Sequence, residues 1–144
     1  GWPLPNCWLG ISVENQATAD ERIPLLLSTP AAKHFVSCEP LLGPINFFHV
    51  SAMEGPYTDW LKGEVREVVC GEEGIYARFK GLDLVIVGGE SGPNYRPMDL
   101  EWARSLRAQC KTAGTAYYFK QRAGPRPGLY DDVPEDLKVR EWPV

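Results

Sequence analysis

Leu82-Asp83-Leu84-Val85-Ile86-Val87-Gly88-Gly89-Glu90-Ser91-Gly92 contains an unbroken apolar run, Leu84 to Val87, which ends in a polar, glycine-rich corner. A short, continuous apolar run of this kind is typical of a strand buried on both faces, as in a parallel sheet. The corner then lies at the carboxyl end of the strand, where α/β folds collect their ligands and catalytic groups. The stretch therefore predicts a buried strand that presents Glu90 at a functional edge.

Other stretches repeat this pattern on either side of it. Residues 7–13, 33–37 and 115–119 predict further strands, each followed by polar residues. Residues 17–28 predict a helix, and a second helix is expected between Asp99, which can cap its free amides, and the stop at Gly114. Strands that alternate with helices favour parallel βαβ units with right-handed crossovers.

The predicted fold class is α/β, either half of a TIM-like barrel or an open, mostly parallel sheet of about four βα-type strands. The expected organisation is one domain over residues 1–144, and its core comprises residues 6–46 and 82–124. Residues 47–81 form an insertion, with a hairpin around Gly71 to Gly74 or, as the alternative, a helix over 59–69. Residues 125–144 are a tail expected to pack loosely across the surface.

Composition and charge limit the classes of protein to which this chain can belong. With 144 residues and 44% hydrophobic content the chain can form one ordinary core, and the net charge of −4 gives no basic field for nucleic acid or an anionic membrane. Apolar runs are too short to span a bilayer, so we expect a soluble, cytoplasmic protein. The cysteines lack metal-site spacing and are expected to be buried and reduced; the aromatic residues of the strands are expected in the core.

Two familiar motifs do not fit the corner at Gly88. A dinucleotide-binding loop opens a helix directly, whereas here the helix begins only near Asp99 and Glu90 would repel phosphate. A nucleophile elbow needs G-x-S-x-G and a later histidine, but Pro93 replaces the second glycine and both histidines come earlier. The remaining interpretations are a functional carboxylate at the edge of the sheet and a structural Glu that locks its own loop.

Polar residues follow all the predicted strands and would converge on one edge if the strands are parallel neighbours. The catalytic candidates are Glu39, Glu90 and Lys120. The candidates for binding a substrate or cofactor are Ser12, Glu14, Asn15, Ser37, Gly88, Gly89, Ser91 and Gln121.

The chain also resembles a known family. The segments that carry the resemblance are Trp8-Leu9-Gly10-Ile11-Ser12-Val13-Glu14-Asn15-Gln16, Phe35-Val36-Ser37-Cys38-Glu39-Pro40-Leu41-Leu42-Gly43-Pro44-Ile45, Val85-Ile86-Val87-Gly88-Gly89-Glu90-Ser91-Gly92 and Phe119-Lys120-Gln121. Together they look like the carboxyl-terminal half of a phage and prophage protein family of unknown function, the gp thirty-seven/gp sixty-eight type.

This resemblance implies a barrel related to radical S-adenosylmethionine enzymes. Full-length members carry an amino-terminal C-x6-C-x2-C-Y cluster for a [4Fe-4S] centre that works with S-adenosylmethionine. None of the four cysteines here matches that cluster, so no cofactor is expected for this chain alone. Half a barrel has open edges, and the expected partners are an amino-terminal half-barrel or a second copy, unless the insertion covers an edge.

The leading hypothesis is the substrate-side half of a radical-type barrel enzyme. A second hypothesis is a divalent-metal enzyme in which Glu14, Glu39 and Glu90 bind magnesium or manganese and Lys120 acts as base. A third is a non-catalytic binding module, a truncated prophage remnant that keeps the fold without the chemistry.

Overall fold

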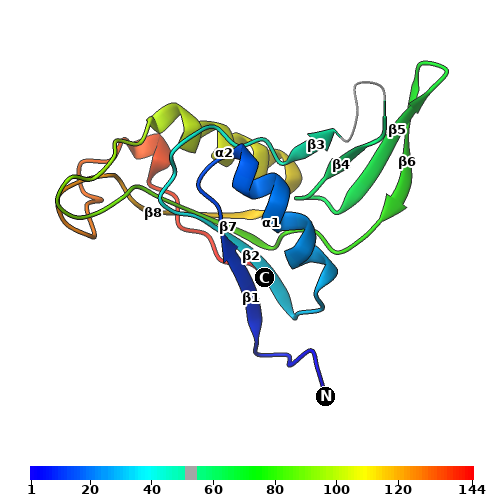
Figure 1. Cartoon of the computed structure of the whole chain (residues 1–144), viewed down its shortest axis with the longest axis horizontal. Helices are drawn as coiled ribbons and strands as arrows, with labels where there is room; N and C mark the ends of the chain where they lie inside the picture. Colours follow the sequence, from blue (N-terminus) through cyan, green and yellow to red (C-terminus); the bar gives the residue numbers. More distant parts are fainter. Residues whose placement is uncertain (51–54) are drawn as a thin grey trace.

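The computed structural model describes residues 1–50 and 55–144, which form a parallel and an antiparallel sheet (Figure 1). The parallel sheet has four strands in chain order, β1 (Trp8–Ser12), β2 (Lys33–Cys38), β7 (Leu84–Gly88) and β8 (Ala116–Gln121). The prediction of a mixed α/β fold with a parallel sheet is confirmed. That this sheet is half of a barrel stays a prediction.

Both predicted helices are present, and both have the capping residues that their sequences indicate. Asn15 caps α1 (Gln16–Ser28) in a reciprocal arrangement with Thr18, which satisfies amides that the first turn leaves free. Asp99 caps α2 (Leu100–Ala113) by accepting a hydrogen bond of 2.9 Å from the amide of Glu101. Gly114 ends α2 at φ 76°, a conformation that glycine adopts without steric cost.

One face of the parallel sheet carries the core. Because side chains alternate along a strand, Val36 and Cys38 of β2 point to the same side as Val85 and Val87 of β7. These residues pack in one cluster with the buried sides of α1 and α2. Tyr117 ties α2 to the sheet, since its hydroxyl donates a hydrogen bond of 3.1 Å to the carbonyl of Ala103. The sheet thus has both helices on one side.

The opposite face of the parallel sheet, called here the open face, receives neither helix. Gly10, Phe35, Ile86 and Tyr118 point to this side, and the latter three are half-buried. The ring of Phe35 lies directly over Gly10, where a Cβ atom would overlap it.

Three aromatic side chains contact one another on the open face. Trp142 contacts Tyr118 and Trp8 at centroid distances of 5.1 and 6.4 Å. Trp8 and Trp142 are 40% and 62% exposed, so the expectation that the strand aromatics are core residues is wrong for Trp8.

The insertion forms a second sheet of four antiparallel strands, β3 (Phe48–Val50), β4 (Tyr57–Asp59), β5 (Glu64–Val69) and β6 (Glu72–Arg78). The predicted insertion over 47–81 includes residues 51–54, which lie outside the described residues. The hairpin is confirmed, but the predicted four-residue connection, residues 71–74, is wrong, because β6 begins at Glu72 and the turn consists of Cys70 and Gly71, both at positive φ. The alternative helix over 59–69 is also wrong.

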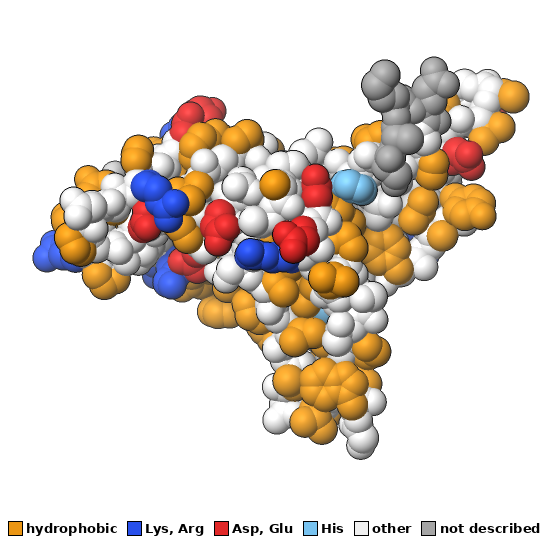
Figure 2. Space-filling view, in the orientation of Figure 1, with side chains coloured by type: hydrophobic (Ala, Val, Ile, Leu, Met, Phe, Trp, Pro, Cys, Tyr) orange, Lys and Arg blue, Asp and Glu red, His pale blue; other side chains and the backbone are white. Residues whose placement is uncertain are grey.

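The hairpin of β5 and β6 extends away from the rest of the molecule (Figure 1). Every residue of β6 is exposed, and hydrophobic side chains are visible over the projecting hairpin and the amino-terminal segment in Figure 2. At the base of the insertion, by contrast, Phe47, Trp60 and Leu61 are buried in the main core. The second sheet is therefore anchored to the body at one end only.

The prediction of a loosely packed tail is wrong. Val133 and Leu137, the latter in the short helix η1 (Glu135–Leu137), are buried in the core. The amide of Phe119 donates to the carbonyl of Val139 at 2.8 Å, and the amide of Glu141 donates to the carbonyl of Tyr117 at 2.9 Å.

These hydrogen bonds place the tail along the outer edge of β8, and Arg140 stacks over Tyr130 at 3.8 Å from the ring centroid. Covering an edge of the sheet with the insertion was one of the alternatives, but in the structure the tail lies along the β8 edge. Across the described residues β1 has no strand on its other side. No helix in this part of the chain combines the length and apolar character that crossing a membrane requires.

Candidate functional site

The carboxyl ends of β2, β7 and β8 bring an ionised network together on the open face. Glu39, just after β2, places Oε2 at 3.1 Å from Nζ of Lys120 in β8. Its other oxygen, Oε1, accepts a hydrogen bond of 2.9 Å from the hydroxyl of Ser37. Glu39 has 18% of its side chain exposed and Lys120 has 54%, so the ion pair is reachable from solvent. The structure brings together three of the predicted residues, Ser37, Glu39 and Lys120.

Gly88 makes room for this network. A Cβ atom at Gly88 would overlap the carboxylate of Glu39, which lies across the end of β7. Glycine is found where another group must approach the backbone closely. Gly88 thus provides the space that Glu39 occupies, and its predicted role in binding a substrate or cofactor stays a prediction.

Ser12 continues the site toward β1. Ser12 and Ser37 are register partners in the parallel pair β1 and β2, so their side chains point to the same face. Ser12 is exposed, and its carbonyl accepts a hydrogen bond of 2.8 Å from Arg22. The Ser37 hydroxyl contacts Glu39, and the Ser12 side chain lies on the same face one strand away.

Glu90 is held differently. Its carboxylate accepts hydrogen bonds from Nε and Nη2 of Arg96 at 2.8 and 3.0 Å and from the Arg96 amide at 2.8 Å. The side-chain bonds and then the amide bond to Arg96 lower the pKa of Glu90 from 4.5 to about 2. These contacts hold the loop that carries Glu90, and its catalytic role stays a prediction.

Arg96 was missed in the sequence. The hydrogen bond that Arg96 donates to Glu90 is the largest cause of the raised pKa of Arg96, and the charge of Glu14 is a smaller one. Arg96 follows Glu90 by six residues in a loop rich in glycine and proline, and loop geometry of this kind gives no periodic signal. A search for a cation able to neutralise Glu90 is the only route by which the sequence could have indicated it.

Other predicted residues serve the local structure. Asn15 is occupied as the cap of α1, and the amide of Glu14 donates to the hydroxyl of Thr18 at 2.9 Å. Gln121 is buried, and its Nε2 donates to the carbonyl of Gly89 at 3.0 Å while its Oε1 accepts from the amide of Gly128 at 2.8 Å.

The loop after β7 lies against the loop after β8. A Cβ atom at Gly89 would overlap the backbone at Ala123, and Ser91 forms an isolated parallel bridge with Gly124. Gly89, Ser91 and Gln121 therefore join the two loops, and this arrangement holds the carboxyl edge of the sheet in place.

The cysteines do not fit an iron-sulfur cluster. Cys38 and Cys110 are buried in the core, and burial raises the pKa of both thiols, that of Cys110 to about 12. Cluster ligands are thiolates, which this environment disfavours. Cys7, which precedes β1, is half-buried, and Cys70 is exposed in the distant hairpin turn, so the expectation that the cysteines are buried is wrong for these two. Their positions in the fold also do not place them in one site with Cys38 and Cys110.

Metal binding by the predicted carboxylates has no support in the geometry. Among the residues that the structure describes, no group of three or more His, Cys, Asp and Glu side chains is gathered closely enough to hold a metal ion. Glu39 is paired with Lys120 and Glu90 with Arg96, in separate contacts.

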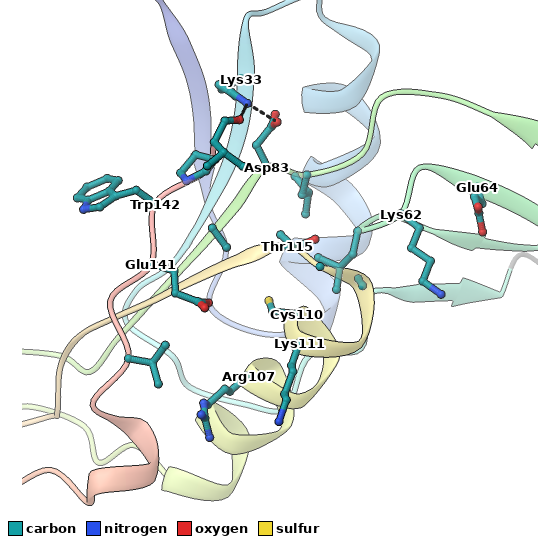
Figure 3. A pocket seen from close by; sticks show the side chains of 18 residues that line it. Lys33, Lys62, Glu64, Asp83, Arg107, Cys110, Lys111, Thr115, Glu141 and Trp142 are labelled. Carbon is teal, nitrogen blue, oxygen red and sulfur yellow. Dashed lines mark hydrogen bonds and ion pairs between the residues drawn. The ribbon is translucent and has the colours of Figure 1, made fainter.

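Another pocket lies at the opposite edge of the parallel sheet. It has a volume of about 710 Å³ and opens between the carboxyl end of α2, the tail and the residues that precede the strands (Figure 3). Lys33 and Asp83 form an ion pair of 3.4 Å at this end, close to Thr115. Because the carboxyl ends of the strands are the functional side of parallel α/β sheets, we assign the candidate site to the network around Glu39.

Comparison with known proteins identifies the family. Residues 1–133 match the family model described as a protein of unknown function, DUF5131. Neither the curated proteins nor the solved structures give a match. The family match includes all four strands of the parallel sheet and both helices that flank its site. The chain therefore belongs to the DUF5131 family.

Proposed function

We propose that this chain is the substrate-side half of a barrel enzyme related to radical S-adenosylmethionine enzymes. The observation that carries the proposal is the network of Ser37, Glu39 and Lys120, which stands on the open face at the carboxyl edge. An ionised network that is reachable from solvent, at the edge where parallel sheets bind ligands, is a candidate catalytic or binding centre.

The arrangement of the layers supports a barrel wall. In a βα-barrel the helices lie outside, and the inward side chains of the strands fill the interior. Here both helices lie on one side, while Gly10, Phe35, Ile86 and Tyr118 line the other. A parallel sheet is normally covered on both faces, so the open face is expected to meet further protein.

The chemistry of the network suggests how a substrate would be held. Lys120 offers a cationic donor, Glu39 an anionic acceptor, and Ser12 and Ser37 two hydroxyl groups on one surface. Such a set orients a polar substrate that carries both a donor and an acceptor. The radical type of reaction rests on the resemblance alone, and a cluster would have to be bound by residues other than these 144.

Two experiments test the proposal. A relative that carries the amino-terminal cysteine cluster would be reconstituted with iron and sulfide and assayed for reductive cleavage of S-adenosylmethionine. Cleavage is expected, whereas absence of both cluster and cleavage would remove the radical part of the proposal. This first experiment leaves the barrel interior untested.

The interior is tested by thiol labelling in a Cys70→Ser background. A cysteine at position 86, on the open face, should react with a maleimide in this chain and be protected in the longer relative. A cysteine at position 68, on the projecting hairpin, should react in both and serves as the control. Equal labelling of position 86 in the two proteins would contradict the barrel.

A further inference from the structure

The outer strands of the two sheets differ in how well their free edges are protected. Proteins prevent an edge from pairing with another chain by covering it, by keeping the strand short, or by placing charges and bulges on it. The tail covers β8, β3 has only three residues, and β6 carries Glu72, Glu73 and Arg78 and has a register irregularity in its pairing with β5. The fourth outer strand is β1.

The edge of β1 has none of these protections. Its sequence, Trp8-Leu9-Gly10-Ile11-Ser12, contains no charged residue and no proline. It pairs with β2 in unbroken register, and in the described part of the chain no strand lies on its other side (Figure 1). A regular, uncharged strand edge of this kind is a template for pairing with another strand.

The backbone groups of β1 that face away from β2 follow from the alternation of the strand. The amide of Val13, just after β1, donates to the carbonyl of Ser37 in β2 at 3.0 Å. The N–H and C=O of one strand residue point to the same neighbour, and those of the next residue point to the opposite side. The residues whose polar groups face outward are therefore Trp8, Gly10 and Ser12.

These outward groups are complementary to those of a second β1. In an antiparallel pair of two β1 strands centred on Gly10, each Gly10 lies opposite Gly10 of the second copy, and Trp8 lies opposite Ser12 of the second copy. Residues that face each other in this way exchange both of their N–H···O bonds. The Ser12 carbonyl accepts a hydrogen bond from Nη1 of Arg22 at 2.8 Å, and its second lone pair is left for the new bond.

The side chains agree with the same register. Leu9 lies opposite Ile11 of the second copy on the helix side of the sheet, in the type of pair where side chains approach most closely. Both residues are half-buried and pack against the main core, so pairing would cover more of their apolar surface. A register centred on Leu9 or Ile11 instead leaves one end of each strand without a partner strand.

We propose that this chain forms a two-fold dimer through the edge of β1, in which two β1 strands pair antiparallel around Gly10 and join the two parallel sheets into one. The partner is a second copy of the chain, because one register satisfies the outward backbone groups and the apolar side chains of both strands together. The proposal does not rest on the proposed barrel, in which a strand of the longer relative would occupy the same edge.

The first test is sedimentation velocity of the chain under reducing conditions. One pair of short strands is a small interface, so we expect a reversible dimer with a Kd on the order of 0.1 mM. Over a dilution series from about 1 mM to about 10 µM, the mass should fall from nearly that of two chains to that of one. A monomer throughout this series would overturn the proposal.

A matched pair of variants tests the strand edge itself. Ser12→Pro removes the outward amide, which has no partner within the described chain, and Ser12→Ala removes only the hydroxyl. The proline variant should raise the Kd of the dimer by about tenfold or more, whereas the alanine variant should leave it close to that of the wild type. Equal dimerisation of the two variants would show that the β1 edge is not the interface.

Cross-linking tests the register. In a background with Cys7→Ser and Cys70→Ser, one preparation carries Trp8→Cys and another carries Ser12→Cys, so that the two thiols lie opposite each other only when the preparations are mixed. Mild oxidation should link two chains in the mixture and far less in either preparation alone. A yield in the mixture no higher than in the separate preparations would contradict the register centred on Gly10.

Discussion

The carboxylate of Glu39 occupies the space that a side chain on Gly88 would need. This relationship links the end of β2 to the end of β7 and aligns Glu39 with both Ser37 and Lys120. The glycine is therefore part of the site, although it makes no polar side-chain contact itself.

Replacing Gly88 with Ala should displace the Glu39 carboxylate and break its contacts with Ser37 and Lys120. Because the displaced atoms belong to a flexible side chain, the free energy of unfolding should fall by only about 1 kcal/mol. A crystal structure of the variant gives the Glu39 to Lys120 distance, and urea unfolding gives the stability. Gly74→Ala is the matched control, since a Cβ atom there meets nothing within 4 Å; an unmoved Glu39 would contradict the prediction.

The ion pair of Glu39 and Lys120 should contribute little to folding. It is substantially exposed, and exposed pairs contribute about 0.2–1 kcal/mol. A double-mutant cycle with Glu39→Gln and Lys120→Met, measured by urea unfolding, should give a coupling energy in that range. A coupling above about 2 kcal/mol would instead assign the pair to the support of the fold.

Acid should weaken the loop that Arg96 and Glu90 hold together. The folded-state pKa of Glu90 is lowered from 4.5 to about 2, so its stabilising contribution is complete above pH 4.5 and is lost as the pH falls through about 2. In Glu90→Gln the melting temperature should therefore depend less on pH across this window than in the wild type. Identical curves for the two proteins between pH 2 and 5 would show that the pair is not formed in solution.

The stability of the fold should depend on the side-chain volume at position 10, where Gly10 lies under the ring of Phe35. Gly10→Ala places a methyl group inside the ring of Phe35, and overpacking of this kind costs about 1–3 kcal/mol. Thermal or urea unfolding measures the loss. Phe35→Leu in the same background should recover part of it, whereas additive losses in the double variant would argue against the contact.

Removing the tail after Lys138 should expose the outer edge of β8. The hydrogen bonds from the Phe119 amide to the Val139 carbonyl and from the Glu141 amide to the Tyr117 carbonyl would be lost. This loss leaves backbone amide and carbonyl groups of β8 without partners. Light scattering should show more self-association for the shortened chain than for the full chain. Arg140→Ala, which keeps these backbone groups, is the control and should not increase association.

Local signals in the sequence were sufficient for the parallel sheet and its helices. The apolar run from Leu84 to Val87 and the caps Asp99 and Gly114 act within a few residues of themselves, so they can be read without knowledge of the fold. That Glu39 and Lys120 lie on one edge was predicted from the rule that parallel strands share a carboxyl edge, whereas the carboxylate that pairs with Lys120 was identified only by the structure.

Long-range packing determined the remaining features. The role of Arg96 depends on a loop conformation, and the docking of the tail depends on Val133, Leu137 and the edge of β8 meeting across many residues. The strands of the insertion are short and largely exposed, so the hydrophobic alternation that distinguishes a strand from a helix is weak over residues 59–69. No pattern in the sequence indicates that the buried Oδ2 of Asp59 in β4 has no hydrogen-bond partner.

The exposed aromatic cluster of Trp8, Tyr118 and Trp142 also gives the protein an optical reporter. Indole emission shifts to shorter wavelength when water is excluded from the ring, and exposed indoles are accessible to soluble quenchers. Anything that covers the open face would therefore change the fluorescence of Trp8 and Trp142, against the emission of the other three tryptophans, Trp2, Trp60 and Trp102. These side chains would therefore report the binding of any partner to the open face without an added label.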